Sequence, residues 1–163
     1  MSQTVSILLE PQLDINHIHT TLYQGAWPPF GNKLAELGFH VLVLTAKDNQ
    51  QADRYDEIEI ICAPGDDDMR RHRLERFLPV WKDAAQQVVK HVRDNKNVVV
   101  TCMAGQNRSG LVVALALQEL TGWSGKKVVK HIQSRRMWAL NNTTFEDYII
   151  QSFPKIEDNV DDE

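Results

Sequence analysis

A cysteine, an arginine and a serine are spaced along one short segment in a way that suits the binding of an anion. The segment VVVTCMAGQNRSGLVVALALQEL, residues 98–120, places five residues between Cys102 and Arg108, and Ser109 follows directly. A positive side chain at the start of a helix opposes the helix macrodipole, so a bound anion would compensate for its cost. A loop of this length can curl around such an anion, with backbone N–H groups and the arginine fork holding its oxygens.

The positive environment of such a loop would also act on the cysteine. A free thiol is mostly protonated at neutral pH, whereas helix N-termini and nearby cations favour the thiolate, which is the nucleophile. Ser109 can donate a hydrogen bond to the sulfur and help it to leave when a covalent intermediate breaks down. Gly105 and Gly110 permit close turns and close approach of the backbone. The residues expected to bind the anion are Met103, Ala104, Gly105, Gln106, Asn107 and Arg108.

This pattern resembles the signature of the cysteine-dependent protein phosphatases, and among them the dual-specificity phosphatases, in which cysteine, five residues, arginine and serine or threonine join a strand to a helix. The resemblance runs over nearly the whole chain. TTLYQGAWPP is similar to the opening of the family domain, LVLTAKDNQ to its first buried strand, and RLERFLPVWKDA to the helix before the signature. RRMWALNNTTFEDYI resembles the family's Arg-Pro…Pro-Asn-x-x-Phe segment, with Asn142 on the asparagine and Phe145 on the phenylalanine.

The resemblance implies a metal-independent phosphatase that needs no cofactor. Its substrates would be phosphomonoesters, namely phosphotyrosine and phosphoserine or phosphothreonine of proteins, and Cys102 would form a phosphocysteine intermediate. It also implies that Asn142 braces the phosphate loop, although turn chemistry alone equally fits a turn residue before a capped helix. Phosphate-like anions are the expected ligands of the loop.

Displacing an alkoxide or phenoxide from phosphorus requires a proton donor at the leaving oxygen. The segment APGDDDMRR supplies Asp66, Asp67 and Asp68 after a predicted strand, where the family carries its aspartate. We take Asp68 as the general acid because its distance to Leu74 resembles the family register. Asp66 and Asp67 remain alternatives, and three adjacent acids also fit a solvated turn.

The sequence departs from the family where Thr101 stands in place of the usual histidine before the cysteine. We therefore expect a less favoured thiolate and activity shifted towards higher pH. Uncharged residues inside the loop disfavour a polyphosphorylated lipid as the substrate. Gly-x-Asn-Arg, residues 105–108, is also similar to the RNA 5′-triphosphatase branch, so this activity remains an alternative, as does a catalytically weak phosphate-binding module.

Runs of branched residues predict buried strands at 40–45, 58–62 and 98–102, with an edge strand at 21–25. Helical spacing predicts helices at 74–94, 109–120 and 126–137, and a last one from residue 143. This order predicts a single α/β domain whose central, mostly parallel sheet of four to five strands is flanked by helices on both faces.

Four residues indicate where these helices begin. Pro79 is expected in the first turn of its helix, and Ser124 is expected to cap the helix that follows it. Thr143 and Glu146 have the spacing of a capping box.

The composition agrees with one ordinary globular domain of 163 residues. We expect the catalytic domain to span residues 1–155 and the acidic end, IEDNVDDE (156–163), to be disordered. A net charge of −4 disfavours binding to nucleic acid or to an anionic membrane over the whole surface. The opening residues resemble no secretory signal, so we expect a cytoplasmic protein, acting as a monomer on a phosphoprotein.

Three further features allow more than one interpretation. Cys62 ends a strand expected beside that of Cys102, so a protective disulfide, as in some relatives, competes with an inert buried cysteine. The HIH sequence at residues 17–19 could present two metal ligands but lacks a third, so we expect no metal site. Trp27 could line the rim of the site, but core packing is the more common fate of tryptophan.

Overall fold

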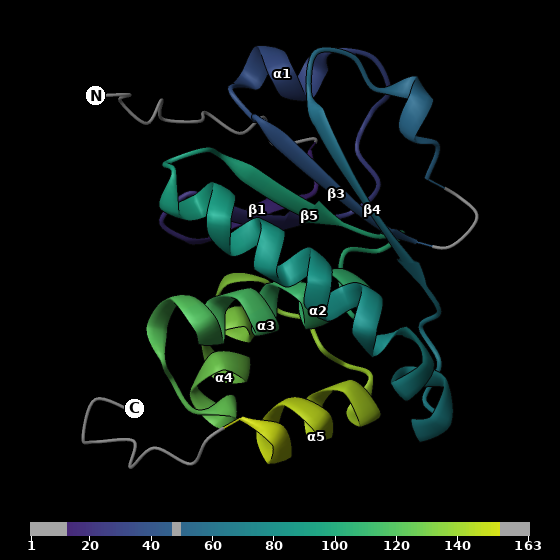
Figure 1. Cartoon of the computed structure of the whole chain (residues 1–163), viewed down its shortest axis with the longest axis vertical. Coiled ribbons are helices and arrows are strands. Elements are labelled where there is room, and N and C mark those ends of the chain that lie inside the picture. Colours follow the sequence, from purple (N-terminus) through teal and green to yellow (C-terminus); the bar gives the residue numbers. More distant parts are fainter. Residues whose placement is uncertain (1–12, 47–49, 154–163) are drawn as a thin grey trace.

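A five-stranded sheet in the order β1-β2-β5-β3-β4 forms the centre of the computed structural model, which describes residues 13–46 and 50–153 (Figure 1). β1 and β2 pair antiparallel, and every other neighbouring pair is parallel, which confirms the predicted mostly parallel sheet. The strands are β1 Ile15–His19, β2 Leu22–Gly25, β3 Val41–Ala46, β4 Glu59–Gly65 and β5 Val98–Thr101.

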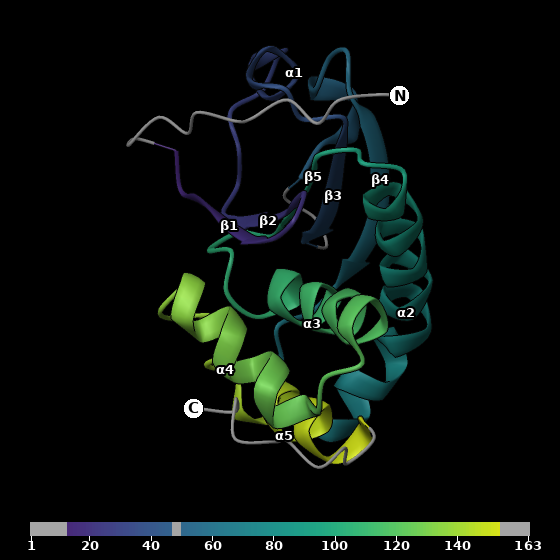
Figure 2. The same ribbon diagram turned by 90° about the vertical axis from the view of Figure 1, so that its left-hand side faces the viewer.

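Helices cover both faces of this sheet, but unequally. The four longer helices pack together on one face, and the short α1 lies on the other side (Figure 2). Alternate residues of a strand point to opposite faces. Accordingly, Val98 and Val100 join the large core with the four helices, whereas Val99 packs with Leu34 and Tyr55 on the opposite face. The helices are α1 Lys33–Leu37, α2 Arg71–Arg93, α3 Arg108–Thr121, α4 Gly125–Arg135 and α5 Thr143–Ser152, with a 3-10 turn at Ala52–Arg54.

The strand β1 was not predicted. The strand predicted at residues 21–25 is present as β2, but its predicted position at the edge of the sheet was wrong. β1 forms the edge, and β2 lies between β1 and β5. Ile15 packs on one face of the sheet and Ile18 on the other, with a register shift between His17 and His19. This strand therefore lacks the alternation that marks a half-buried strand in a sequence. Among the described residues, no group of three or more His, Cys, Asp or Glu side chains is placed to hold a metal ion.

The start of one helix and the cap of another differ from the predictions. α2 begins at Arg71, so Pro79 lies well inside the helix and not in its first turn. A proline there removes one backbone hydrogen bond, but Leu74, Leu78 and Trp81 are buried along the same helix and stabilise it against that loss. α5 is capped by Asn142, whose side chain accepts hydrogen bonds from the N–H groups of Thr144 and Phe145, so the predicted capping by Thr143 was wrong.

The cap of α4 agrees with the prediction. Ser124 caps α4 as predicted, because its hydroxyl accepts a hydrogen bond from the backbone N–H of Lys127 at 3.2 Å. The predicted acidic tail, 156–163, and the predicted boundary at residue 155 lie outside the described residues. Within the ranges that the structure describes, no helix has the length and apolar character needed to cross a membrane.

The cap of α5 gives a test of the fold. Asn142→Ala removes the two hydrogen bonds to the helix N-terminus, and we expect the free energy of unfolding to fall by about 1–2 kcal/mol in urea titrations. Thr143→Ala is the matched control at the exposed neighbouring position, and it should change stability by less than about 0.5 kcal/mol. A larger loss for Thr143→Ala than for Asn142→Ala would contradict this assignment of the cap.

Candidate active site

The residues with the signature spacing join the end of β5 to the start of α3. Thr101 is the last residue of β5 and Arg108 is the first residue of α3, so residues 102–108 form a connecting loop, called here the signature loop. β5 lies between β2 and β3 and runs parallel to both. Ligands of α/β proteins bind at the carboxyl ends of parallel strands, and the signature loop lies at that edge.

Four carbonyl groups of the signature loop, those of residues 103–106, are held from outside the loop. Met103 O accepts from the Trp27 N–H at 3.2 Å, and Gln106 O accepts from the Leu140 N–H at 3.0 Å. The Arg136 guanidinium donates to the carbonyls of Ala104 and Gly105, and the side chain of Gln24 donates to Gly105 O as well. Four residues from two distant regions of the chain, 24–27 and 136–140, therefore fix the orientation of these peptides.

This arrangement turns the N–H groups of residues 104–107 to the other side of the loop, because C=O and N–H point in opposite directions in a trans peptide. Within the described part of the chain, no carbonyl or side chain accepts a hydrogen bond from any of these N–H groups. The side chain of Asn107 does not cap α3 either, so the first N–H groups of that helix also lack a side-chain acceptor. A cluster of unpaired donors at a helix N-terminus binds anions.

Gly105 is required at the tightest point of this loop. Its φ of +69° lies in the left-handed region, which residues with a side chain rarely adopt. A Cβ atom at this position would lie 2.4 Å from the carbonyl carbon of Gly25 and 2.5 Å from the nitrogen of Ala26. The signature loop can therefore approach the end of β2 only with glycine at position 105.

Cys102 and Ser109 are brought together inside the protein. Cys102 is 3% exposed and Ser109 is fully buried, and the distance between Cys102 Sγ and Ser109 Oγ is 3.3 Å. The two residues lie on either side of the signature loop, next to the N-terminus of α3. The sulfur thus lies where the helix and the loop present their N–H groups.

Cys62 does not lie beside Cys102, contrary to the expected order of strands. β3 separates β4 from β5, and Leu44 of β3 pairs with Cys62 on one side and with Thr101 on the other. Two strand spacings amount to about 9–10 Å, whereas cysteines joined by a disulfide have Cα atoms within about 7 Å. Both cysteines are free, and Cys62 is exposed, so it is not the buried cysteine of the alternative interpretation.

The guanidinium of Arg108 has few partners within the protein. Arg108 Nη1 donates to the carbonyl oxygen of Gly65 at 3.3 Å, at the end of β4. Its Nε is buried without a hydrogen-bond partner among the described residues, and no carboxylate there forms an ion pair with it. A half-buried cation without a counterion leaves room for an external anion to satisfy its charge.

The three aspartates of residues 66–68 have different partners. Asp66 forms an ion pair with Arg73. Asp67 accepts hydrogen bonds from the side chains of Asn107 at 2.9 Å and Asn142 at 2.8 Å, so its carboxylate lies against the signature loop. The side chain and the backbone N–H of Arg70 both donate to the Asp68 carboxylate, and they hold the pKa of Asp68 well below its usual range.

Asn142 connects the acidic segment, the signature loop and α5. Its backbone N–H donates to Asn107 Oδ1 at 2.7 Å, and its Nδ2 donates to Asp67. The same amide caps α5 with its oxygen. Asn142 therefore contacts the signature loop through Asn107, which is the contact that a bracing residue needs.

Thr101 is held by neutral groups. Its hydroxyl donates to the carbonyl oxygen of Val43 at 2.9 Å and accepts from the side chain of Gln50 at 2.8 Å. Gln50 in turn accepts from the backbone N–H of Ala46. The Thr101 side chain thus joins β5 to β3 and to the segment after it, and the expected effect on the thiolate stays a prediction.

Sequence reasoning missed two residues that hold the loop, Gln24 and Arg136. Gln24 is fully buried on β2, and a polar residue within an otherwise apolar strand was the signal available. Arg136 is 7% exposed and also binds the carboxylate of Asp14 at 2.8 Å. The resemblance of RRMWALNN to an Arg-Pro…Pro-Asn segment pointed to this region without marking which arginine contacts the loop.

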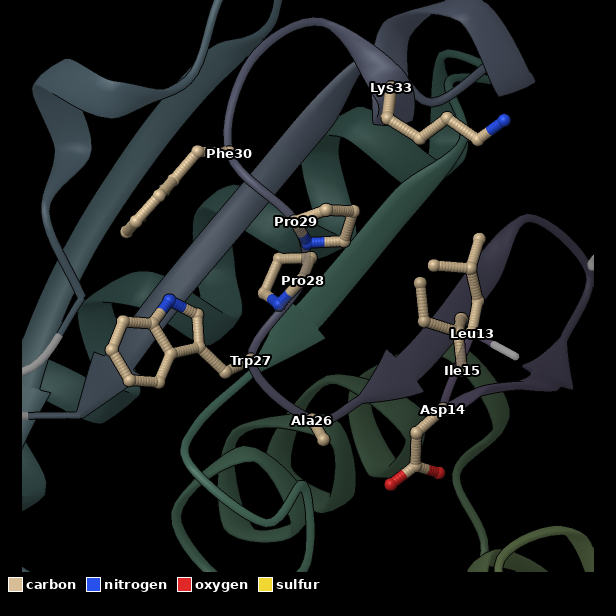
Figure 3. Close-up of a pocket in the computed structure, with 9 residues that line it drawn as sticks. All are labelled: Leu13, Asp14, Ile15, Ala26, Trp27, Pro28, Pro29, Phe30 and Lys33. Atoms are coloured by element: carbon tan, nitrogen blue, oxygen red, sulfur yellow. The ribbon is translucent and has the colours of Figure 1, made fainter.

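Trp27 lies at the surface, so the preferred expectation of core packing was wrong. Its side chain is 42% exposed, and its backbone N–H donates to the signature loop. Figure 3 shows the indole and the ring of Phe30 beside an open groove of about 780 Å³, lined mainly by apolar and proline side chains. The groove adjoins the loop on the side of β1 and β2.

The model of the dual specificity phosphatase catalytic domain matches residues 22–154. A mouse putative dual specificity phosphatase complexed with zinc tungstate is 21% identical, with a TM-score of 0.73, over 93% of this chain and 92% of that chain. Human DUSP28 is 19% identical, with a TM-score of 0.70, over 91% of this chain and 96% of that chain.

PTPMT1 in complex with PI(5)P is 16% identical, with a TM-score of 0.61, over 83% of this chain and 96% of that chain. At such identities these structures establish the fold alone. No match to a curated protein was found. The catalytic-domain match, however, covers every strand and helix from β2 to α5. The chain therefore belongs to the dual specificity phosphatase family.

Proposed function

We propose that this protein is a metal-independent phosphatase that hydrolyses phosphotyrosine and phosphoserine or phosphothreonine of proteins through a phosphocysteine at Cys102. The observation that carries the proposal is the signature loop beside the sulfur of Cys102. Its carbonyls at residues 103–106 are bound from outside, and its N–H groups at residues 104–107 have no acceptor among the described residues. Arg108, whose guanidinium forms no ion pair with a described carboxylate, begins the adjoining helix. Such a loop fits a tetrahedral dianion better than a neutral ligand.

In the first step the Cys102 thiolate attacks phosphorus, and the bond to the leaving oxygen breaks as that oxygen takes a proton. The loop N–H groups and Arg108 stabilise the equatorial oxygens in the transition state. In the second step a water molecule attacks the phosphocysteine, the S–P bond breaks, and the electron pair returns to sulfur. Ser109 donates a hydrogen bond to the departing thiolate, and the carboxylate that gave the proton takes one from water.

The proton donor is proposed to come from the segment of residues 66–68, with Asp68 in that role. For this, the Asp68 carboxylate must leave Arg70 when the substrate binds. Asp67 is the rival, because it already contacts the signature loop through Asn107, whereas Asp66 is bound to Arg73. Asn142 and Thr101 support the loop and β5 without touching the reacting atoms.

The compartment, the substrate class and the domain bounds are proposed from composition and from the family match. Two free cysteines suit a reducing, cytoplasmic compartment. The loop carries no lysine to meet additional phosphates, and the net charge of −4 disfavours nucleic acid, so a phosphoprotein is the proposed substrate of a monomeric enzyme. We place the catalytic domain at residues 1–155, in keeping with the family match at 22–154.

The first test is the release of para-nitrophenol from its phosphate ester with reductant and EDTA present. We expect turnover in the native protein and none in Cys102→Ser, because the alcohol is a far weaker nucleophile than the thiolate. The control is Cys62→Ser, at the exposed cysteine, which should retain native turnover.

Three results would contradict the proposal. Turnover that disappears with EDTA would point to a metal-dependent enzyme. No turnover at any pH, with phosphate still bound, would identify a phosphate-binding module. Preferential release of phosphate from RNA with a 5′-triphosphate would identify the other branch of the superfamily.

The acid can be identified through its partner. Arg70 lowers the pKa of Asp68, so Arg70→Ala raises that pKa, and the protonated form persists to higher pH. If Asp68 is the acid, the alkaline limb of the kcat/KM profile moves to higher pH in Arg70→Ala. Arg71→Ala is the control, since Arg71 pairs with Glu75 and not with the acidic segment. The role would instead belong to Asp67 if the alkaline limb did not move in Arg70→Ala and disappeared from the kcat/KM profile of Asp67→Asn.

A further inference from the structure

We infer that Gln24 is a positioning residue that directs the hydroxyl of Ser109 towards the sulfur of Cys102, an inference that rests on the proposed function. Gln24 lies in the middle of β2 and is fully buried. Its Nε2 lies 3.2 Å from Ser109 Oγ and 3.0 Å from Gly105 O, and the more distant Gln106 O is at 3.4 Å. A single amide thus contacts both ends of the site, the loop and the first turn of α3.

The surroundings of Gln24 fix which end of its amide faces the site. Two of the three neighbouring atoms are backbone carbonyl oxygens, which can only accept hydrogen bonds. The reverse orientation would place the amide oxygen against both of them. The NH₂ group must therefore face the signature loop and Ser109, while Oε1 is buried without a partner in the described part of the chain. A buried, unpaired acceptor is destabilising. The hydrogen bonds that the NH₂ group donates must therefore offset this cost.

This orientation decides where the single proton of the Ser109 hydroxyl points. The hydroxyl oxygen accepts a hydrogen bond from Gln24, so its own proton cannot point towards that amide. The sulfur of Cys102, at 3.3 Å, is then the acceptor within reach. A thiolate has no proton to donate, and the contact between the two atoms persists only if the serine O–H donates. Gln24 thus selects the rotamer of the hydroxyl that stabilises negative charge on sulfur.

The hydrogen bond from Ser109 acts in both states of the reaction in which the sulfur of Cys102 is negatively charged. The free thiolate that attacks phosphorus is stabilised by the hydrogen bond from Ser109. The same bond stabilises the thiolate that leaves when water attacks the phosphocysteine, while the proton of that water passes to the carboxylate. Ser109 transfers no proton in either step. Loss of Gln24 should therefore disfavour the thiolate and slow the breakdown of the intermediate.

The test is a double-mutant cycle of Gln24→Met and Ser109→Ala, read by the ultraviolet absorbance of the Cys102 thiolate as the pH is raised. The signal of Cys102 is obtained by difference from Cys102→Ser in a Cys62→Ser background. We expect the midpoint of the Cys102 thiolate titration to move to higher pH in each single variant. The double variant should move no further than Ser109→Ala alone, because Gln24 acts through Ser109. This measurement requires no turnover, so it stands apart from failure of the proposed function.

Kinetics supply the second readout in the native enzyme and its variants. Gln24→Met should lower kcat for para-nitrophenyl phosphate by about tenfold or more. This is the effect of losing a hydrogen bond to a charged group, here the bond from Ser109 to the thiolate of Cys102. Since breakdown of the phosphocysteine becomes limiting, a burst of about one equivalent of para-nitrophenol should precede steady turnover. The control Gln86→Met, at an exposed position of α2, should leave both the midpoint and kcat unchanged.

Two outcomes would overturn the inference. Equal shifts of the midpoint by Gln24→Met with and without Ser109 would mean that Gln24 supports the loop as a whole. No shift in either background would mean that it does not affect the sulfur. If thermal unfolding shows that Gln24→Met is not folded, Gln24→Asn takes its place, because the shorter amide withdraws from Ser109 while a polar group stays on β2. The same two criteria apply to it.

Discussion

The orientation of a few peptide groups in the signature loop is the constraint on which the rest of this structure depends. Each carbonyl from Met103 to Gln106 is bound by a donor outside the loop, and peptide planarity then turns the N–H groups towards the proposed anion site. The donors come from β2, from the segment after β2, from the C-terminal end of α4 and from the segment before α5. A loop built in this way cannot be separated from the domain, because segments far apart in the sequence have to meet around it.

Arg136 and Arg108 divide the positive charge between structure and ligand. Arg136 binds the loop carbonyls with one side of its guanidinium and the Asp14 carboxylate with another, so its charge is compensated within the protein. Arg108 donates a hydrogen bond to the carbonyl of Gly65, and among the described residues no carboxylate pairs with it. The field of Arg108 and of the loop N–H groups is therefore left for an external anion. One arginine holds the site in shape, and the other is free to bind.

The parts of this site that could be predicted are those that depend on neighbours in the sequence. The spacing of Cys102 and Arg108 between an apolar strand and an apolar helix placed the loop, and runs of branched residues placed β3, β4 and β5. β1 was missed because its two buried isoleucines lie on opposite faces. Gln24 was missed because its contacts with Gly105 and Ser109 span more than eighty positions, which no local pattern records.

The three adjacent aspartates illustrate the same limit. Their side chains are chemically identical, and the sequence offers only a register by which to choose among them. Their partners differ because the backbone turns between them, so that one faces Arg73, one faces Asn107 and Asn142, and one faces Arg70. The protonation of each carboxyl then follows from its own partner, which only the folded chain specifies.

Neutral amides hold three residues in and around the signature loop. Gln24 holds Ser109, Asn142 holds Asn107, and Gln50 holds Thr101. A carboxylate in any of these places would oppose an anion in the loop, whereas an amide supplies a donor and an acceptor without net charge. The same reasoning applies at Thr101, the position where the family resemblance would place a histidine. The pair of Thr101 and Gln50 joins β5 to β3 through groups that do not titrate between about pH 5 and 8, where a histidine changes its charge. This contact between β5 and β3 is therefore insensitive to pH over that range.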